Sequence, residues 1–230
     1  MSCYAEICFL ITSPVSTFRG SGPKATQPIM PLRLFDSPVR AGAAVARLLF
    51  AGSMIGFFFS TQLFQDYLGW TPLQAALGFV PMTLLQFLFS PRVTRLAARV
   101  GMAPLIAAGL LFVLAGLGWL AFASGGASYL ADVLGPMLFI GIGQGIAFGP
   151  LTNVGVHGAA SEDAGAASGM VNTAHQLGST LGIAVLTAAS VRTDTMIEGF
   201  QAVYAGAAVM VGIALAAVVF VVAPALRGRG

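Results

Sequence analysis

The chain has 230 residues, of which 57% are hydrophobic and only 8% are charged. Soluble domains carry about 25% charged residues, so this composition cannot cover a water-facing surface and excludes an ordinary soluble domain. The formal net charge of +3 comes from basic residues between long apolar runs, which indicates orientation in a membrane rather than nucleic-acid binding. The lipid bilayer is therefore the expected solvent.

Six stretches are long and apolar enough to cross a bilayer, which takes about 20 mostly apolar residues. The predicted spans are 43–63, 73–90, 103–123, 130–148, 165–189 and 202–222. Proline marks several boundaries: Pro72 opens the second span, Pro91 closes it, Pro150 ends or breaks the fourth, and Pro224 ends the sixth. The predicted fold class is an all-α membrane protein with six transmembrane helices.

Three regions follow from this pattern. Residues 1–38, rich in Ser, Thr and Pro before the first span, are predicted to form a disordered cytoplasmic tail, residues 39–224 the membrane domain, and residues 225–230 a cytoplasmic C-terminal tail. Basic loops alternate with non-basic loops along the chain. Arg40 and Arg47 precede or enter the first span, and Arg227 and Arg229 follow the sixth. A loop after the second span holds Arg92, Arg95 and Arg99. By the positive-inside rule, both termini are expected in the cytoplasm of a multi-pass cell-membrane protein.

A polar stripe runs along the fifth span. Gly165, Gly169, Asn172, Gln176 and Ser179 recur at helical spacing and fall on one narrow face. The two glycines favour close helix packing. The two amides fit equally well with interhelical hydrogen bonds or with the lining of a substrate cavity.

Other polar groups within the spans are further candidates for the cavity. His175 is read as the only ionisable residue well inside a span, either able to carry a proton or, as the simpler interpretation, hydrogen-bonded between helices. Gln144 lies beside the overlapping GxxxG steps of Gly141, Gly145 and Gly149, a pattern typical of close packing. Gln86 lies inside the second span. The predicted cavity residues are Gln86, Gln144, Asn172, His175 and Gln176.

Several of these segments together resemble a known family. The run from Glu162 to Gly169, followed by Asn172 and Gln176 to Gly178, resembles the penultimate helix of the fourteen-helix drug:proton antiporter branch of the major facilitator superfamily. Segments 63–72, 78–81 and 141–150 resemble earlier helices of that family in the same order, so the likeness covers about residues 40–223, the C-terminal six-helix half.

The resemblance implies a transporter that exports a small amphipathic or cationic substrate against protons, through a site between two six-helix halves. The family's N-terminal half has no counterpart here, so a truncated or half-transporter is expected, completed by a second half or by a homodimer. Thr94 and Ala98 replace a Gly and an Asp of the family's basic loop, which argues against gating by that loop. The alternative is a non-transporting remnant, or a modulator of a partner transporter.

An enzyme is not expected. Ser168 and His175 suggest a serine protease only superficially, because seven residues on one helix put them about 10.5 Å apart along the axis. Cys3 and Cys8 have no neighbouring His or Cys, so no metal is predicted, and no motif indicates a cofactor.

Overall fold

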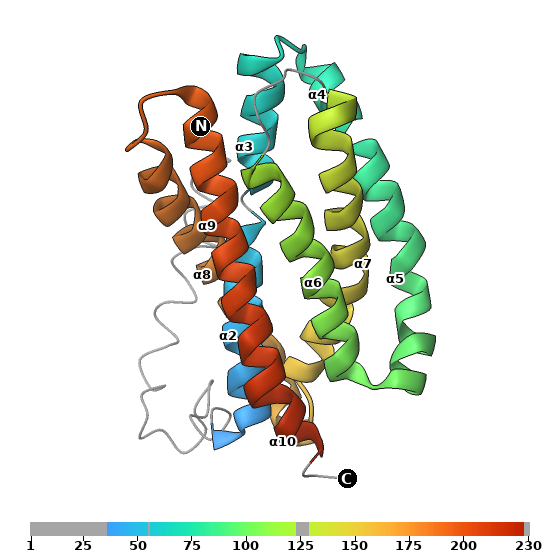
Figure 1. Ribbon diagram of the computed structural model, residues 1–230. Coiled ribbons are helices and arrows are strands. Elements are labelled where there is room, and N and C mark those ends of the chain that lie inside the picture. Colours follow the sequence, from blue (N-terminus) through green and yellow to red (C-terminus); the bar gives the residue numbers. More distant parts are fainter. Residues whose placement is uncertain (1–35, 55, 123–128, 228–230) are drawn as a thin grey trace, which may run out of the picture.

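The computed structural model describes residues 36–54, 56–122 and 129–227, and these residues are helical apart from short turns (Figure 1). Nearly all of the segment predicted as a disordered tail, residues 1–38, lies outside the described residues. The elements are α2 (Pro38–Ser53), α3 (Gly56–Gln62), η2 (Leu63–Tyr67), α4 (Pro72–Gly78), α5 (Val80–Val100), α6 (Met102–Ala121), η3 (Tyr129–Leu134), α7 (Gly135–Gly155), η4 (Ser161–Asp163), α8 (Ala164–Ser190), α9 (Met196–Ala217), η5 (Val218–Val222) and α10 (Ala223–Arg227).

Five helical stretches of the described chain are long and apolar enough to cross a membrane. They are Pro38–Tyr67, Pro72–Val100, Met102–Ala121, Asp132–Gly155 and Met196–Arg227. The remaining predicted span corresponds to α8, which has 27 residues and is long enough. It does not reach the same hydropathy, because its polar stripe dilutes the apolar residues.

Proline ends fewer helices than predicted. α5 continues through Pro91 to Val100, although the missing proline N–H removes one helical hydrogen bond. The guanidinium of Arg92 donates to the Leu88 carbonyl beside this break. Arg92, Arg95 and Arg99 therefore lie on the last turns of a helix, and their assignment to a loop was wrong.

The fourth and sixth spans also run past their prolines. Pro150 lies inside α7, which extends to Gly155. Pro224 lies inside α10, so helix continues to Arg227, beyond the domain boundary expected at residue 224. Within a membrane, neighbouring helices and local π-type turns such as η5 tolerate such prolines.

The long helices form two layers, one of which contains α2. α2 packs against α7, α8 and α9, while α5 packs on the outer side of α7. α6 packs against both α7 and α9, and α6 and α9 lie together at the front of Figure 1. Four helices (α5, α7, α2 and α8) thus lie in one layer behind the pair α6 and α9.

Glycines set the closest helix contacts. A Cβ at Gly109 of α6 would lie 2.8 Å from the Gly143 carbonyl of α7, and one at Gly145 would lie 2.8 Å from the Gln86 carbonyl of α5. Gly141 likewise faces Met82 of α5. The packing role predicted for Gly141 and Gly145 is confirmed, whereas Gly149 has no neighbour within 4 Å among the described residues.

One buried hydrogen bond links α3 to α9. The hydroxyl of Tyr204 lies 2.8 Å from Ser60 Oγ, and Ser60 Oγ itself donates to the Gly56 carbonyl at 2.9 Å. A serine hydroxyl has one proton, so Tyr204 is the donor in the first bond.

Removing the Tyr204 hydroxyl and removing the Ser60 hydroxyl should lower the free energy of unfolding by different amounts. Tyr204→Phe removes one donor and should lower the free energy of unfolding by about 1 kcal/mol, whereas Ser60→Ala leaves a buried tyrosine hydroxyl unpaired and should cost about 1–3 kcal/mol. Unfolding in mixed micelles measures both. A larger loss for Tyr204→Phe than for Ser60→Ala would contradict this assignment of donor and acceptor.

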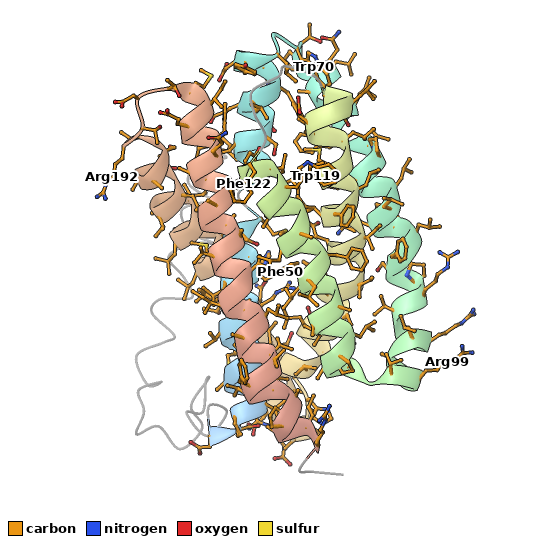
Figure 2. All side chains as sticks on the ribbon, in the orientation of Figure 1. Phe50, Trp70, Arg99, Trp119, Phe122 and Arg192 are labelled. Atoms are coloured by element: carbon orange, nitrogen blue, oxygen red, sulfur yellow. The ribbon has the colours of Figure 1, made fainter. Side chains whose placement is uncertain are left out.

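Both described ends of the chain lie at one end of the bundle. Gly42 at the start of α2 lies against Val221 and Val222, close to α10. Figure 2 shows Arg99 of α5 near this end and Arg192, after α8, near the opposite end. The first of these two ends carries most of the arginines: Arg40 near the start of α2, Arg92, Arg95 and Arg99 toward the end of α5, and Arg227 on α10.

Candidate functional site

Both layers expose large apolar side chains, and α8 exposes amides as well. The exposed large side chains of α6 and α9, with the adjoining η5, are apolar: Leu111, Phe112, Trp119, Val209, Ile213 and Phe220. Such a surface matches lipid. The exposed side of α8 carries amides and hydroxyls together with apolar side chains that include Leu177, Leu181 and Val185.

Asn172 and Gln176 lie on the exposed side of α8. The buried residues of the same helix, such as Ala167, Val171 and Ala174, lie on the opposite side. Within the described part of the chain, no hydrogen bond is formed by either amide side chain. A polar amide facing hydrocarbon is costly, so this face requires a polar neighbour or water.

The glycines of the predicted stripe do not pack within the described chain. Gly165 and Gly169 have nothing within 4 Å of an added Cβ, so the predicted packing role is wrong for the contacts described here. The glycines that let α8 approach α2 are Gly178 and Gly182, which face the backbone at Leu48 and Gly52. They lie on the buried side, about 100–140° around the helix from the centre of the stripe.

A buried cation lies where α2, α7 and α8 meet. Arg47 of α2 is 5% exposed, and its guanidinium carbon lies 4.0 Å from the ring centroid of Phe148 on α7. Its Nη1 donates to the Phe148 carbonyl at 3.4 Å, while its buried Nε has no hydrogen-bond partner. No acidic side chain of the described residues pairs with it.

His175 of α8 contacts the same aromatic ring. Its ring is 6.1 Å from that of Phe148, at an interplanar angle of 82°. Its buried Nδ1 has no hydrogen-bond partner among the described residues. Phe148, itself 42% exposed, thus contacts two poorly satisfied nitrogen-bearing side chains.

The remaining candidates are distributed around this centre. Gln144 is 5% exposed on α7, one turn from Phe148, and its Nε2 lies 2.9 Å from the Met54 sulfur at the end of α2. Gln86 is half-buried on α5, with its backbone against Gly145. The fold therefore brings Gln144 and His175 toward the Arg47–Phe148 pair, while Gln86 lies on the far side of α7, and Asn172 and Gln176 face outward.

Arg47 was missed as a site residue, and the reading of His175 as the only ionisable group well inside a span was wrong. The predicted first span began at residue 43, which placed Arg47 near its end. The helix begins at Pro38, so Arg47 lies nine residues further in, about 13.5 Å along the axis. Proline is favoured in the first helical turn, and Pro38 was the available signal.

The match to known proteins identifies the family. A family model described as the Major Facilitator Superfamily matches residues 3–183, which run from the segment before α2 into α8. The chain belongs to the Major Facilitator Superfamily. The all-α fold agrees with this membership, and the predicted superfamily resemblance is confirmed.

Curated relatives of this superfamily member carry export or resistance names. The cephamycin export protein CmcT of Amycolatopsis lactamdurans is 38% identical over 164 residues, covering 70% of this chain and 34% of the relative. The multidrug resistance protein Stp of Mycobacterium tuberculosis is 33% identical over 167 residues, 71% of this chain and 30% of the relative. The methylenomycin A resistance protein of Streptomyces coelicolor is 34% identical over 165 residues, 71% of this chain and 34% of the relative. The chain thus spans about a third of the length of these relatives.

Proposed function

We propose that this superfamily member is one half of a proton-coupled exporter of small molecules, equivalent to the C-terminal six helices of the fourteen-helix drug-antiporter branch. The names of its relatives, which include export and multidrug resistance proteins, support export as the direction of transport. Their greater length supports the need for a second half. Transport is favoured over catalysis, since Ser168 and His175 are held two turns apart on α8.

The observation that carries this proposal is the pair of exposed amides on α8, Asn172 and Gln176. In facilitator transporters the substrate site lies between two halves near the bilayer midplane. Asn172 and Gln176 face away from their own bundle, next to the exposed Leu177. A second six-helix half, or a second copy of this chain, would cover the amides and enclose a cavity with them.

The substrate we propose is a small amphipathic molecule, with a neutral or negatively charged polar group favoured over a cationic one. The described spans hold the buried guanidinium of Arg47 without an acidic partner, so this half contributes positive charge inside its first span. A cationic substrate would need carboxylates from the other half. His175, beside Arg47, is the residue we propose to exchange a proton during transport.

Liposomes containing the purified chain test the proposal. Substrate-dependent proton movement, read with a pH-sensitive dye, is expected from a homodimer or from the chain joined to a second half, but not from a monomer. Asn172→Ala and Gln176→Ala should each reduce this flux. Gln201→Ala, on α9 outside the proposed cavity, is the matched control and should leave the flux unchanged.

Two results would contradict the proposal. Flux from a confirmed monomer would remove the need for a second half. The second result is a stable assembly that neither binds nor moves substrate, together with a partner transporter that works equally well without this chain. That result would favour an inert remnant over both a transporter and a modulator.

We also propose that the described ends face the cytoplasm. Arginine gathers at the end of the bundle where α5 finishes and α10 lies, which supports this orientation by the positive-inside rule. In a chain with Cys3 and Cys8 replaced by Ser, a membrane-impermeant thiol reagent applied to intact cells should label Arg192→Cys and not Arg99→Cys. Labelling of Arg99→Cys alone would reverse the topology.

A further inference from the structure

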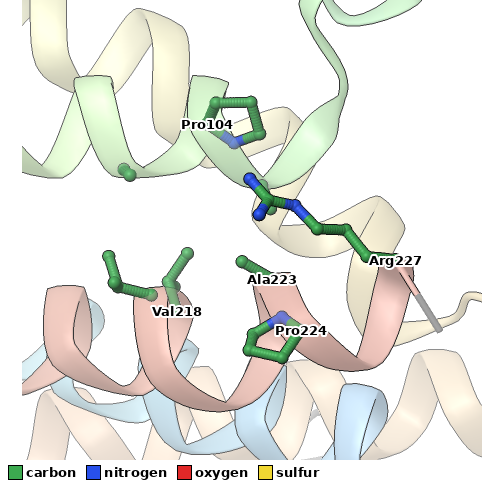
Figure 3. A pocket seen from close by; sticks show the side chains of 8 residues that line it. Pro104, Val218, Ala223, Pro224 and Arg227 are labelled. Carbon is green, nitrogen blue, oxygen red and sulfur yellow. The ribbon is translucent and has the colours of Figure 1, made fainter.

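A groove opens on the lipid-facing side of the bundle, between the start of α6 and the end of the last span (Figure 3). Its volume is about 250 Å³, and its walls include Pro104 and Ala107 of α6, Val218 and Val219 of η5, and Pro224 and Arg227 of α10. We propose that this groove holds an acyl chain of an anionic phospholipid, whose phosphate is bound by Arg227.

The walls of the groove select for hydrocarbon. Apart from the Arg227 head group, the side chains that face it are alanine, valine and proline. The groove continues the apolar outer surface of α6, α9 and η5, where Leu111, Val209 and Phe220 are exposed. At this volume it is smaller than the pockets of about 300–1,000 Å³ that enclose drug-sized ligands, but it accommodates part of a lipid tail.

The mouth of the groove selects for a negative head group. Figure 3 shows the Arg227 side chain reaching from α10 across the groove toward Pro104 of α6. Arg227 is exposed and has no ion pair within the described part of the chain. The adjacent α6 N-terminus has no side-chain cap at Gly101, so its positive dipole end adds to the attraction for a phosphate.

The position along the bundle fits the depth of a lipid. Arg227 lies at the end where the arginines of α5 also lie, and Val218 is nine residues further into the last span, about 13.5 Å along its axis. The Arg227 cation would lie at the level of the phospholipid head group, and the apolar groove would lie at the level of its acyl chain. Basic pockets between helices on the cytoplasmic side are known to favour anionic lipids.

Native mass spectrometry of the chain in detergent tests this proposal, with phosphatidylglycerol or phosphatidylcholine added at equal concentration. The chain should retain phosphatidylglycerol preferentially. Arg227→Gln should weaken phosphatidylglycerol retention about fivefold with little effect on phosphatidylcholine. Ala107→Leu, which fills the groove, should reduce retention of both lipids while leaving thermal unfolding without added lipid unchanged.

Arg99→Gln is the matched control, because it removes a cation at the same end without touching the groove. An equal loss of phosphatidylglycerol in Arg99→Gln and Arg227→Gln would mean general surface attraction and would overturn the proposal. Retention unaffected by Ala107→Leu would do the same. A dimer mass that Ala107→Leu converts to monomer would make the groove an interface between copies and would also overturn it.

Discussion

Arg47→Met is expected to abolish export by the assembled transporter while leaving the bundle as stable as before, or more stable. The buried guanidinium has a single long hydrogen bond to the Phe148 carbonyl and an unpaired Nε, so its burial is poorly compensated. Replacing a poorly satisfied buried ion by an apolar side chain of similar volume is often neutral or stabilising by about 1–4 kcal/mol. Substrate flux in liposomes and unfolding in micelles measure the two effects.

Arg47→Lys separates charge from shape. Lysine keeps the positive charge but lacks the planar group that lies over Phe148 at 4.0 Å, so partial flux is expected if charge alone attracts the substrate. A purely structural role for Arg47 predicts a different result, in which Arg47→Met loses stability and flux together. That outcome would remove Arg47 from the proposed site.

Gly109→Ala is expected to cause a large loss of stability at the α6–α7 contact, where Gly116 and Gly143 are packed at least as tightly. The added Cβ would lie 2.8 Å from three atoms of α7, including the Ala147 nitrogen and the Gly143 carbonyl. Because backbone atoms cannot move aside, the two helices must separate, and overpacking of this kind costs about 1–3 kcal/mol. This loss should exceed the gain of up to about 1 kcal/mol from better helix propensity.

Gly118→Ala, on the same helix, is the matched control. An added Cβ there meets nothing within 4 Å, so only the propensity gain applies, and stability should stay constant or rise. Thermal unfolding of both variants in one detergent gives the comparison. Equal shifts of the unfolding temperature in both variants would show that α6 and α7 can move apart at little cost, which would contradict the prediction.

Helix order and approximate position could be predicted from the sequence, but helix ends could not. The apolar runs placed five spans correctly, because hydropathy is a local property of 20 residues. Pro91 misled the assignment of the second span, because the cost of a proline inside a helix depends on what satisfies the freed carbonyl nearby. The arginines after it were therefore assigned to a loop instead of to α5.

Periodicity identified polar and small-residue stripes without revealing what faces them. Gly141 and Gly145 share the four-residue spacing of Gly165 and Gly169, yet the first pair contacts α5, whereas an added Cβ at either of the second pair meets no described residue within 4 Å. Spacing fixes which residues share a face, whereas the neighbours of that face depend on the whole bundle. For this reason the amides of Asn172 and Gln176 could be named in advance, but their outward direction could not.

By itself, the sequence determined the solvent, the helical class and the superfamily resemblance, since each follows from composition or from the order of segments along the chain. Only the tertiary structure decided that Arg47 is buried beneath Phe148, that His175 lies beside the same ring, and that the two amides of α8 face away from their own bundle. The physical reason is that these residues are far apart in the chain: Arg47 of α2 and Phe148 of α7, for example, are 101 residues apart. Their contacts arise from packing, which no local pattern contains.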